Sequence, residues 1–244
     1  MAVRVPERVA DATERSATLD TPIFRSSAAR PRHCRADERG DGNLSQVARL
    51  IHLNGPPGIG KSTVASAFAD RHPGVLNLDI DQLAALIGGW RDRFSDSFEA
   101  GRLLAEAMAQ VHLANGHDVI MLQMMTEVNA EELAGFEAAA AAPKAEYCQI
   151  LQMARVESAF ECCMERAKGG DPRHVVISKV IDENGGREFV RKLHSHVTQV
   201  SARRQPHAVI DCEQLTIEQA CHAVEAALRP ETATHTPHAT RPVG

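Results

Sequence analysis

The sequence is poor in several features that define other classes of protein. Aromatic residues make up only 4% of its 244 residues, and no run of 18 apolar residues occurs, so the sequence predicts no membrane-spanning segment. The six cysteines form no CxxC pair, which argues against a zinc site and favours reduced thiols in a cytoplasmic protein. The formal net charge of −5 argues against a nucleic acid as partner.

The two ends of the chain lack clustered apolar side chains. Residues 1–46 hold eight arginines, seven acidic residues and three prolines, and residues 230–244 are similarly polar. Such segments bury too little apolar surface to offset the conformational entropy lost on ordering. We therefore expect a disordered N-terminal tail at 1–46, one domain at 47–229 and a disordered C-terminal tail at 230–244.

Within the domain, short apolar runs alternate with helical patterns. The expected strands are 49–54, 75–79, 118–122, 147–151 and 207–211. Helices are expected up to about 69, from 97 to 115 with Leu104, Met108 and Val111 on one face, from Asn129 to 143 with a capping box to Glu132, at 155–168 and 182–204, and after the capping pair Thr216 and Gln219. This alternation predicts an α/β fold with a parallel sheet and helices on both faces.

A glycine-rich segment joins the first expected strand to the first helix. It matches the phosphate-loop (Walker A) pattern G-x-x-x-x-G-K-[ST] in the strand–loop–helix context that this pattern requires. Lysine is scarce, with 5 lysines among the 27 basic residues, so a chance match is improbable. The predicted nucleotide-binding residues are Gly55, Pro56, Pro57, Gly58, Ile59, Gly60, Lys61, Ser62 and Thr63.

Each part of the loop has a physical purpose. The glycines let backbone amides converge on a phosphate, and the following helix adds the positive end of its dipole. Lys61 is expected to reach the β- and γ-phosphates, and the Ser62 hydroxyl is expected to bind Mg²⁺. The sequence thus predicts ATP and Mg²⁺ as ligands.

Other motifs narrow the class of phosphate-loop protein. The sequence has no Asn-Lys-x-Asp guanine reader, no LSGGQ-like transporter signature and no expected strand that ends in Asp-Glu, as in motor and AAA-type ATPases. Instead, Asp79 and Asp81 stand at the end of the second strand, where parallel strands face the ligand crevice. One carboxylate can accept the proton of an attacking hydroxyl, and the other can help to hold Mg²⁺. The alternative is that Asp81 only caps the next helix.

Three segments together resemble a known family. The phosphate loop GPPGIGKST, the strand end LDID-QL and the segment MERAKGGDPRH at 164–174 are similar to small phosphate-loop kinases, namely chloramphenicol phosphotransferase-like and AAA-family kinases, and to the kinase half of polynucleotide kinases. The resemblance implies a five-stranded sheet, for which we expect the order 2-3-1-4-5, and a helical lid at about 155–175. It implies Asp81 as the catalytic base, Arg166 and Arg173 as lid arginines over ATP, and the loop from Cys212 to Leu215 beside the adenine.

The sequence departs from this family in two places. The third strand ends on Gln123 where the family often has a carboxylate that supports Mg²⁺. This departure either shifts metal binding to Ser62 and Asp79 or weakens turnover. Ala84 stands where polynucleotide kinases have an arginine, which argues against a nucleic acid acceptor. Trp90 and Phe94 are interpreted either as an acceptor-pocket wall or as packing residues.

Two functions follow from these observations. The first is an ATP-dependent phosphotransferase that transfers the γ-phosphate to a hydroxyl of a small molecule, with Asp81, Lys61, Arg166 and Arg173 as catalytic residues. The second is a nucleotide-binding regulatory or switch ATPase without a phosphoryl acceptor, which the missing carboxylate at Gln123 favours.

Overall fold

The computed structural model describes residues 47–125 and 134–229. The strands are β1 (Arg49–Asn54), β2 (Leu76–Asp79), β3 (Val119–Leu122), β4 (Glu146–Met153) and β5 (Ala208–Asp211). The helices are α1 (Lys61–Arg71), α2 (Ile80–Ala85), α3 (Phe94–Ala114), α4 (Ala134–Ala141), α5 (Val156–Lys168), α6 (Pro172–Glu183), α7 (Arg187–Arg204) and α8 (Ile217–Ala227). None of the described helices is both long and apolar enough to cross a lipid bilayer.

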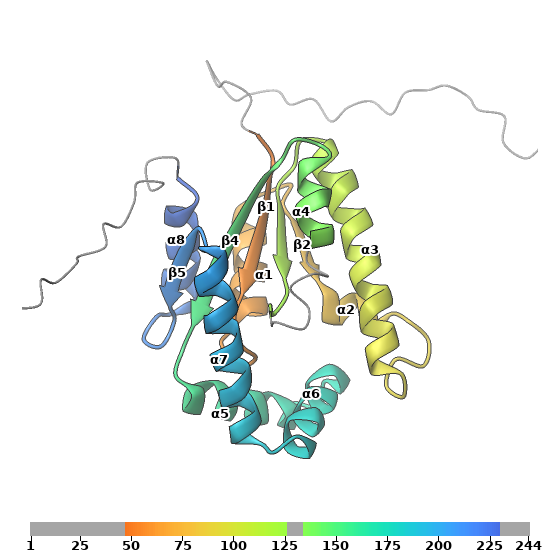
Figure 1. Cartoon of the computed structure of the whole chain (residues 1–244), viewed down its shortest axis with the longest axis vertical. Coiled ribbons are helices and arrows are strands. Elements are labelled where there is room, and N and C mark those ends of the chain that lie inside the picture. Colours follow the sequence, from red (N-terminus) through yellow and green to blue (C-terminus); the bar gives the residue numbers. More distant parts are fainter. Residues whose placement is uncertain (1–46, 126–133, 230–244) are drawn as a thin grey trace, which may run out of the picture. The chain divides into compact units, whose positions relative to one another are not determined.

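The five strands form one parallel sheet in the order β2-β3-β1-β4-β5, which confirms the predicted fold (Figure 1). In the register, Leu53 of β1 lies beside Leu122 of β3, and Leu122 lies beside Asp79 of β2. The carboxyl ends of these three strands therefore meet at one edge of the sheet. At this edge, the phosphate loop directly follows β1, Gln123 directly follows β3, and Asp79 is the last residue of β2.

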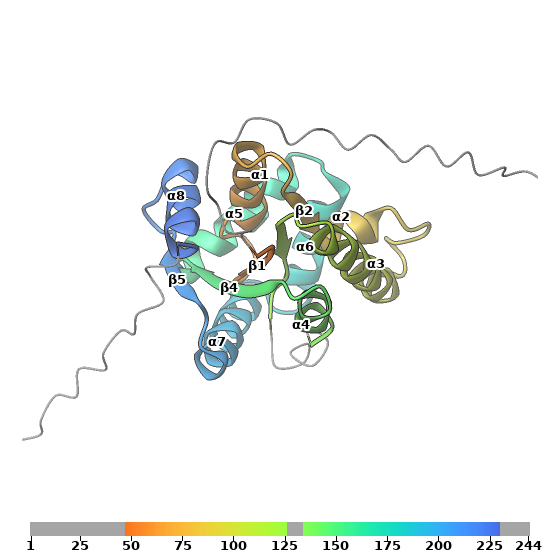
Figure 2. The same ribbon diagram turned by 90° about the horizontal axis from the view of Figure 1, so that it is seen from above.

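Helices cover both faces of the sheet, as seen from above in Figure 2. On one face, α1 and α8 pack against alternate strand residues such as Ile51, Ile120 and Ile150. On the other, α3, α4 and α7 pack against the intervening positions, such as Leu50 and Met121. Because side chains alternate across a strand, strands that are buried on both faces are continuously apolar. The core thus fixes the strand ends that carry the site.

Helices α5 and α6 lie beyond the carboxyl ends of the strands (Figure 1), and residues 155–175, for which the sequence predicts a lid, span α5 and the start of α6. The predicted second helix at 182–204 is wrong in its start, because α6 occupies residues 172–183 and α7 begins at Arg187. Asp171 accepts a hydrogen bond from the backbone N–H of Arg173, and Pro172 takes the first helical position. These residues start α6. Helix α5 ends at Lys168 with Gly169 as its C-cap, and Gly185 and Gly186, both with positive φ, separate α6 from α7.

The long helix α3 buries a different face from the one that its largest side chains suggested. Leu104, Met108 and Val111 share a face, but they are 49%, 39% and 65% exposed. The helix packs through small residues instead, including Ala105 and Ala109, which let its backbone approach the sheet closely. In the helix before β4, the predicted capping box of Asn129 and Glu132 lies outside the described residues, and α4 is described from Ala134.

Candidate functional site

The phosphate loop adopts a conformation that its glycines make accessible. Gly58 and Gly60 have φ values of +84° and +92°, in the left-handed region that favours glycine. Gly60 is the N-cap of α1 and, within the described part of the chain, no side chain caps this helix. The first amides of α1 are therefore not used by a cap, and such amides with the helix dipole suit an anion.

The Lys61 side chain folds back over the loop. Its Nζ donates hydrogen bonds to the carbonyl oxygens of Gly55 and Pro56, both at 2.7 Å. Burial lowers the pKa of Lys61 to about 8, and the carboxylates of Asp81 and Asp79 oppose this shift. The ammonium is thus held at the centre of the loop, beside two carboxylates.

The phosphate loop packs closely against helix α5. A Cβ atom at Gly58 would lie 2.0 Å from the carbonyl oxygen of Ala159 and 2.8 Å from Cys163 Sγ, both in α5. At the start of the loop, Oδ1 of Asn54 accepts hydrogen bonds from the backbone N–H groups of Gly55 at 2.7 Å and Met125 at 2.8 Å. Asn54, which the sequence reading did not single out, therefore ties the loop to the segment after β3.

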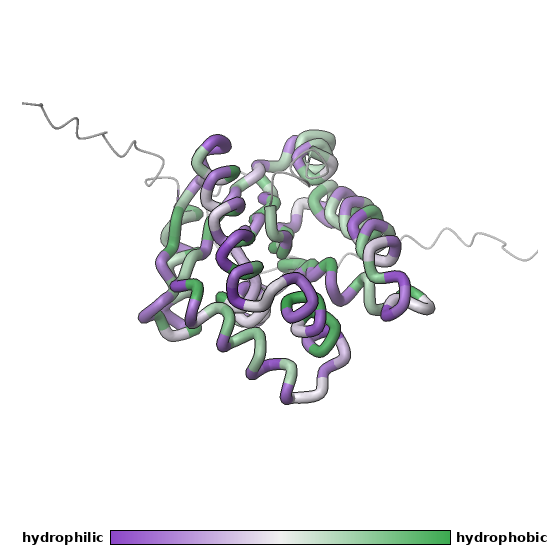
Figure 3. Tube along the Cα trace, turned by 60° about the horizontal axis from the view of Figure 1, so that its bottom comes forward, coloured by the Kyte–Doolittle hydropathy of each residue, from purple (hydrophilic) through white to green (hydrophobic). Residues whose placement is uncertain are grey.

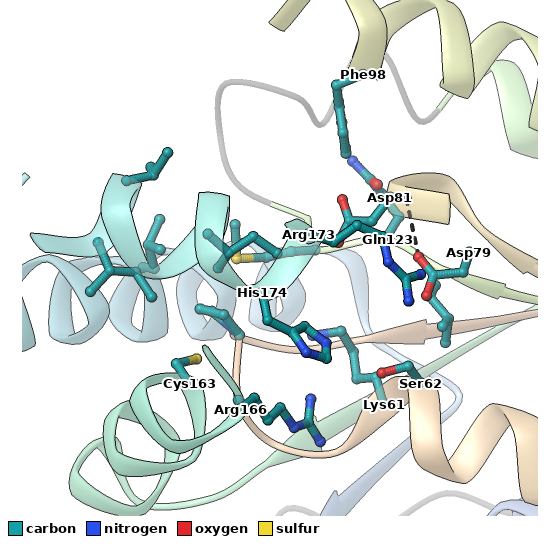
Figure 4. Close-up of a pocket in the computed structure, with 18 of the residues that line it drawn as sticks. Lys61, Ser62, Asp79, Asp81, Phe98, Gln123, Cys163, Arg166, Arg173 and His174 are labelled. Atoms are coloured by element: carbon teal, nitrogen blue, oxygen red, sulfur yellow. Dashed lines mark hydrogen bonds between the residues drawn. The ribbon is translucent and has the colours of Figure 1, made fainter. Parts of the chain in front are cut away.

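The two predicted aspartates have separate surroundings. Oδ1 of Asp79 accepts a hydrogen bond from the backbone N–H of Asp81 at 3.1 Å (dashed in Figure 4), and Oδ2 accepts one from Gln82 Nε2 at 3.2 Å. Asp79 is therefore the N-cap of α2. The Asp81 carboxylate faces the cavity with Lys61, and burial raises its pKa to about 6, with the Asp79 carboxylate adding to the rise.

The residues predicted to hold Mg²⁺ fit this ion. Ser62 and Asp79 line the same cavity as Lys61, and they offer a hydroxyl and a carboxylate oxygen. Within the described residues, no three His, Cys, Asp or Glu side chains gather into a dedicated metal cage. Mg²⁺ commonly takes one or two protein oxygens together with phosphate oxygens and water, so a site shared with a nucleotide suits these two residues.

Gln123 follows β3 and lines the cavity without bringing a charge. The backbone carbonyl oxygen of Gln123 lies 2.7 Å from Nε2 of the fully buried His52. Nδ1 of the same ring lies 2.6 Å from the Tyr147 hydroxyl. Because a carbonyl only accepts, Nε2 carries the proton and Nδ1 accepts from Tyr147. Burial lowers the pKa of His52 to about 4, so the ring is neutral at pH 7.

Helices α5 and α6 contribute both predicted arginines and two residues that the sequence did not single out. Arg166 of α5 and Arg173 of α6 line the cavity together with Cys163 and His174 (Figure 4). The Arg173 guanidinium also pairs with Asp171, with Nη2 2.7 Å from Oδ2. Burial raises the pKa of Cys163 to about 11, so this thiol is protonated. The position of His174 next to Arg173 in the sequence is the signal that could have identified it as a lining residue.

These residues line a cavity of about 370 Å³ that lies between the phosphate loop and helices α2, α3, α5, α6 and α7. Phe94 lines it, as one interpretation predicted, whereas Trp90 is buried outside it with the Arg91 guanidinium 5.0 Å from its ring centre. Phe98, Phe189 and Leu193 also line the cavity, although no sequence motif marked them. The loop from Cys212 to Leu215 is not among the lining residues described.

Comparisons with solved structures identify several proteins that are similar to this chain. A structure from Chloroflexus aurantiacus described as a candidate kinase is 18% identical, with a TM-score of 0.55, and the match covers 75% of this chain and all of that one. The tunicamycin resistance protein of Deinococcus radiodurans is 14% identical, with a TM-score of 0.49 and coverages of 73% and 94%. The APS kinase of Mycobacterium tuberculosis, solved with AMPPNP and APS, is 15% identical, with a TM-score of 0.47 and coverages of 74% and 97%.

At such identities, the first of these matches shows a shared fold alone. No protein of curated function matches the sequence. The model of the AAA domain family, however, matches residues 50–183, which run from β1 to the end of α6 and include the phosphate loop, both aspartates and helices α5 and α6. Because this match spans more than half of the chain, the protein belongs to the AAA domain family, with a phosphate-loop kinase-like fold.

Proposed function

We propose that the protein is a kinase that transfers the γ-phosphate of ATP to a hydroxyl group of a small molecule. The observation that carries the proposal is the place of Asp81. Its carboxylate faces the same cavity as Lys61, while Asp79 satisfies the helix cap. A carboxylate with a pKa of about 6 is ionised at pH 7 and more basic than an ordinary aspartate, as a general base requires.

The proposed reaction uses each predicted residue in one role. The loop amides and Lys61 bind the β- and γ-phosphates, and Ser62 and Asp79 hold Mg²⁺, which neutralises phosphate charge when bound. Asp81 accepts the proton of the acceptor hydroxyl while the hydroxyl oxygen forms a bond to the γ-phosphorus of ATP. The bond from this phosphorus to the β–γ bridging oxygen breaks, and ADP leaves. Arg166 and Arg173 stabilise the charge on the transferred group.

One observation favours a second function, that of a regulatory ATPase with no acceptor. Gln123 brings no negative charge to the end of β3. Among the described residues that line the cavity, Asp79 and Asp81 are the ones that supply carboxylates. A weaker metal site would slow phosphoryl transfer and would leave nucleotide binding largely intact. This alternative uses the same Lys61 and loop amides.

The two functions differ in the fate of the γ-phosphate. The full-length protein is incubated with Mg²⁺, γ-labelled ATP and a pool of small metabolites, and the labelled products are separated. For the kinase, label appears on an organic acceptor with the wild type, and this signal is lost in both Asp81→Asn and Lys61→Ala. Label found only in inorganic phosphate, with ATP still bound through Lys61, would support the regulatory ATPase instead.

A further inference from the structure

The sheet face that α4 and α7 cover carries polar side chains where apolar ones are usual. Leu50 of β1 belongs to the apolar core on this face, and side chains alternate along a strand. The positions of β1 and β4 that share the face with Leu50 include four polar residues, namely His52, Asn54, Tyr147 and Gln149. Parallel strands that are buried on both faces are normally apolar throughout. This part of the sheet is therefore suited to contact with polar groups.

A second cavity, of about 440 Å³, lies over Tyr147 and Gln149. Figure 2 shows α4 and α7 on the same side of β4, and Figure 3 shows hydrophilic residues interspersed with hydrophobic ones along the helices. The lining residues described for this cavity are all polar: Glu137 of α4, Tyr147 and Gln149 of β4, Arg204 and Gln205 at the end of α7, and His207 before β5. Among the described residues, none lines both this cavity and the one at the phosphate loop. We call the second cavity the polar pocket.

An ion pair between two helices forms part of the wall of the polar pocket. Nη1 of Arg204 in α7 lies 2.7 Å from Oε1 of Glu137 in α4, and the two side chains are 32% and 44% exposed. An ion pair with this exposure contributes little to stability, so a ligand can separate the two side chains at small cost. The pocket thus offers a cation and an anion side by side.

These paired charges decide which ligand the polar pocket suits. A molecule with adjacent ammonium and carboxylate groups can pair with Glu137 and Arg204 at the same time. A ligand with a single charge would meet one opposite charge and one like charge, so it would gain less. The amides of Gln149 and Gln205 both donate and accept hydrogen bonds, which suits the remaining polar atoms of such a molecule.

A series of contacts joins the polar pocket to the phosphate loop. Nε2 of Gln149 donates a hydrogen bond to Sδ of Met125 at 3.7 Å. The backbone N–H of Met125 donates to Oδ1 of Asn54 at 2.8 Å, and the same oxygen accepts the backbone N–H of Gly55 at 2.7 Å. Gly55 is the first residue of the phosphate loop. The position of Gln149 is therefore linked to that of the loop through two residues.

Two further links connect the polar pocket with the nucleotide site. The Tyr147 hydroxyl bonds to His52, which bonds in turn to the carbonyl oxygen of Gln123, a lining residue of the phosphate-loop cavity. Nδ2 of Asn54 donates a hydrogen bond to Oγ of Ser201 at 3.1 Å, about one turn of α7 before Arg204. A ligand that orders the β4 floor and the end of α7 therefore restrains the groups that position the loop.

We infer that the polar pocket is a regulatory site for a small zwitterion, a molecule with adjacent ammonium and carboxylate groups such as an amino acid, and that its occupation tightens nucleotide binding at the phosphate loop. A ligand that orders the floor lowers the entropy that nucleotide binding must still lose. By linkage, the nucleotide tightens binding of the zwitterion by the same factor. The inference goes beyond the proposed function and does not depend on phosphoryl transfer, because the kinase and the regulatory ATPase use the same loop.

The binding test uses four probes with the same three-carbon frame on the full-length protein. Serine carries both charges, glycerate carries the carboxylate alone, serinol carries the ammonium alone, and glycerol carries neither. Ligand-observed NMR titration at pH 7 measures the affinity of each probe. We expect serine to bind at least fivefold more tightly than each of the other three. Equal binding of serine and glycerol, tighter binding of a singly charged probe, or no binding of serine would overturn the inferred ligand class.

Charge variants locate the binding. Glu137→Gln keeps the Arg204 cation and should shift the preference to glycerate, whereas Arg204→Gln keeps the Glu137 carboxylate and should shift it to serinol. The matched control is Arg191→Gln, which removes an ion pair with Glu188 on the same helix but outside the pocket, and the preference for serine should stay unchanged. A preference is a ratio measured within one variant, so a moderate loss of stability does not obscure it. An unchanged preference in both pocket variants would overturn the location.

The link to the phosphate loop is tested by calorimetric titration of a non-hydrolysable ATP analogue with Mg²⁺, with and without saturating serine. Serine should tighten binding of the analogue at least threefold. Tyr147→Phe keeps the ring but removes the hydroxyl that bonds to His52, so serine should still bind and the tightening should be smaller. Equal nucleotide affinity with and without serine in the wild type would overturn the regulatory role.

The outcomes separate this inference from the proposed function. Serine that tightens nucleotide binding in a protein that labels no acceptor would contradict the kinase proposal and support the regulatory site. A labelled acceptor, together with a nucleotide affinity that serine leaves unchanged, would support the kinase and overturn the regulatory site.

Discussion

Asp79 caps helix α2 through a 3.1 Å hydrogen bond from the backbone N–H of Asp81, and so leaves the Asp81 carboxylate to the cavity. Two aspartates only two residues apart thus have different roles. Asp79 stabilises the start of α2, whereas Asp81 is a half-buried carboxylate with a raised pKa, which costs stability.

Substitutions of the two aspartates should have opposite effects on stability. Asp79→Ala removes the cap and should lower the free energy of unfolding by about 1 kcal/mol. Asp81→Asn removes a carboxylate whose pKa is raised to about 6, and should raise the free energy of unfolding at pH 7 by about 1–3 kcal/mol. Urea unfolding measures both. A clear loss of stability in Asp81→Asn would show that its carboxylate has a structural role.

The pKa values of Asp81 and His52 make stability depend on pH in opposite directions. The folded state binds the Asp81 proton more tightly than the unfolded state, so this group lowers the free energy of unfolding as the pH rises from about 4 to 6. His52, with its pKa lowered to about 4, binds its proton more weakly when folded, so it raises the free energy of unfolding between about pH 4 and 6.5. Each effect amounts to about 3 kcal/mol and offsets the other.

Single variants should reveal how each group changes the free energy of unfolding with pH. In Asp81→Asn the free energy of unfolding should rise more steeply between pH 4 and 6.5 than in the wild type, because only the His52 effect remains. In His52→Asn it should fall with rising pH, because only the Asp81 effect remains. Urea unfolding at a series of pH values measures the slopes. Parallel curves for all three proteins would refute the assigned pKa shifts.

Nucleotide affinity should also depend on pH, through Lys61. With a pKa of about 8 in the nucleotide-free protein, Lys61 loses its proton above this pH and must regain it to bind a phosphate. ATP affinity should therefore fall as the pH rises from 8 to 10. Lys61→Arg keeps its charge throughout this range, so its affinity, although weaker, should stay level. Calorimetric titration of both proteins provides the comparison, and an equal decline in Lys61→Arg would contradict the explanation.

Gly58 and Gly60 have similar φ angles, +84° and +92°, but different surroundings, and this difference predicts unequal effects of alanine. Gly58→Ala would place a Cβ against the carbonyl oxygen of Ala159 in α5, whereas Gly60→Ala meets no heavy atom within 4 Å. Gly60→Ala should cost about 1 kcal/mol of stability from backbone strain alone. Gly58→Ala should cost about 3 kcal/mol or more and should weaken nucleotide binding as α5 shifts. Similar losses in both variants would show that contact with α5 is unimportant.

The alternation of short apolar runs with helical patterns predicted the parallel sheet, and the resemblance to small phosphate-loop kinases implied its five strands and their order. The expected helix at 182–204 was wrong in its start. Asp171 caps α6 and Pro172 takes its first position, ahead of the expected helix. The sequence also misled where small residues do the packing, since α3 buries Ala105 and Ala109 and exposes Leu104.

The candidate site was predictable as far as local motifs reach. Lys61 and Asp81 lie in short patterns, and the structure brings both to one cavity. Phe98 stands in α3, and Phe189 and Leu193 stand in α7, with spacings that are equally typical of core packing. Their convergence depends on how α3 and α7 pack beside the sheet, which a local pattern does not contain.

The most direct test of the account is the pH dependence of acceptor phosphorylation once an acceptor is found. The rate of label transfer from γ-labelled ATP is measured between pH 5 and 8 for the wild type and for Asp81→Asn, with nucleotide and acceptor both saturating. The account predicts that the wild-type rate rises with pH through about 6 and then levels off, because the base must be ionised, and that Asp81→Asn loses at least a hundredfold in rate and this rise. A similar rate and the same rise in Asp81→Asn would contradict the assignment of Asp81 as the catalytic base.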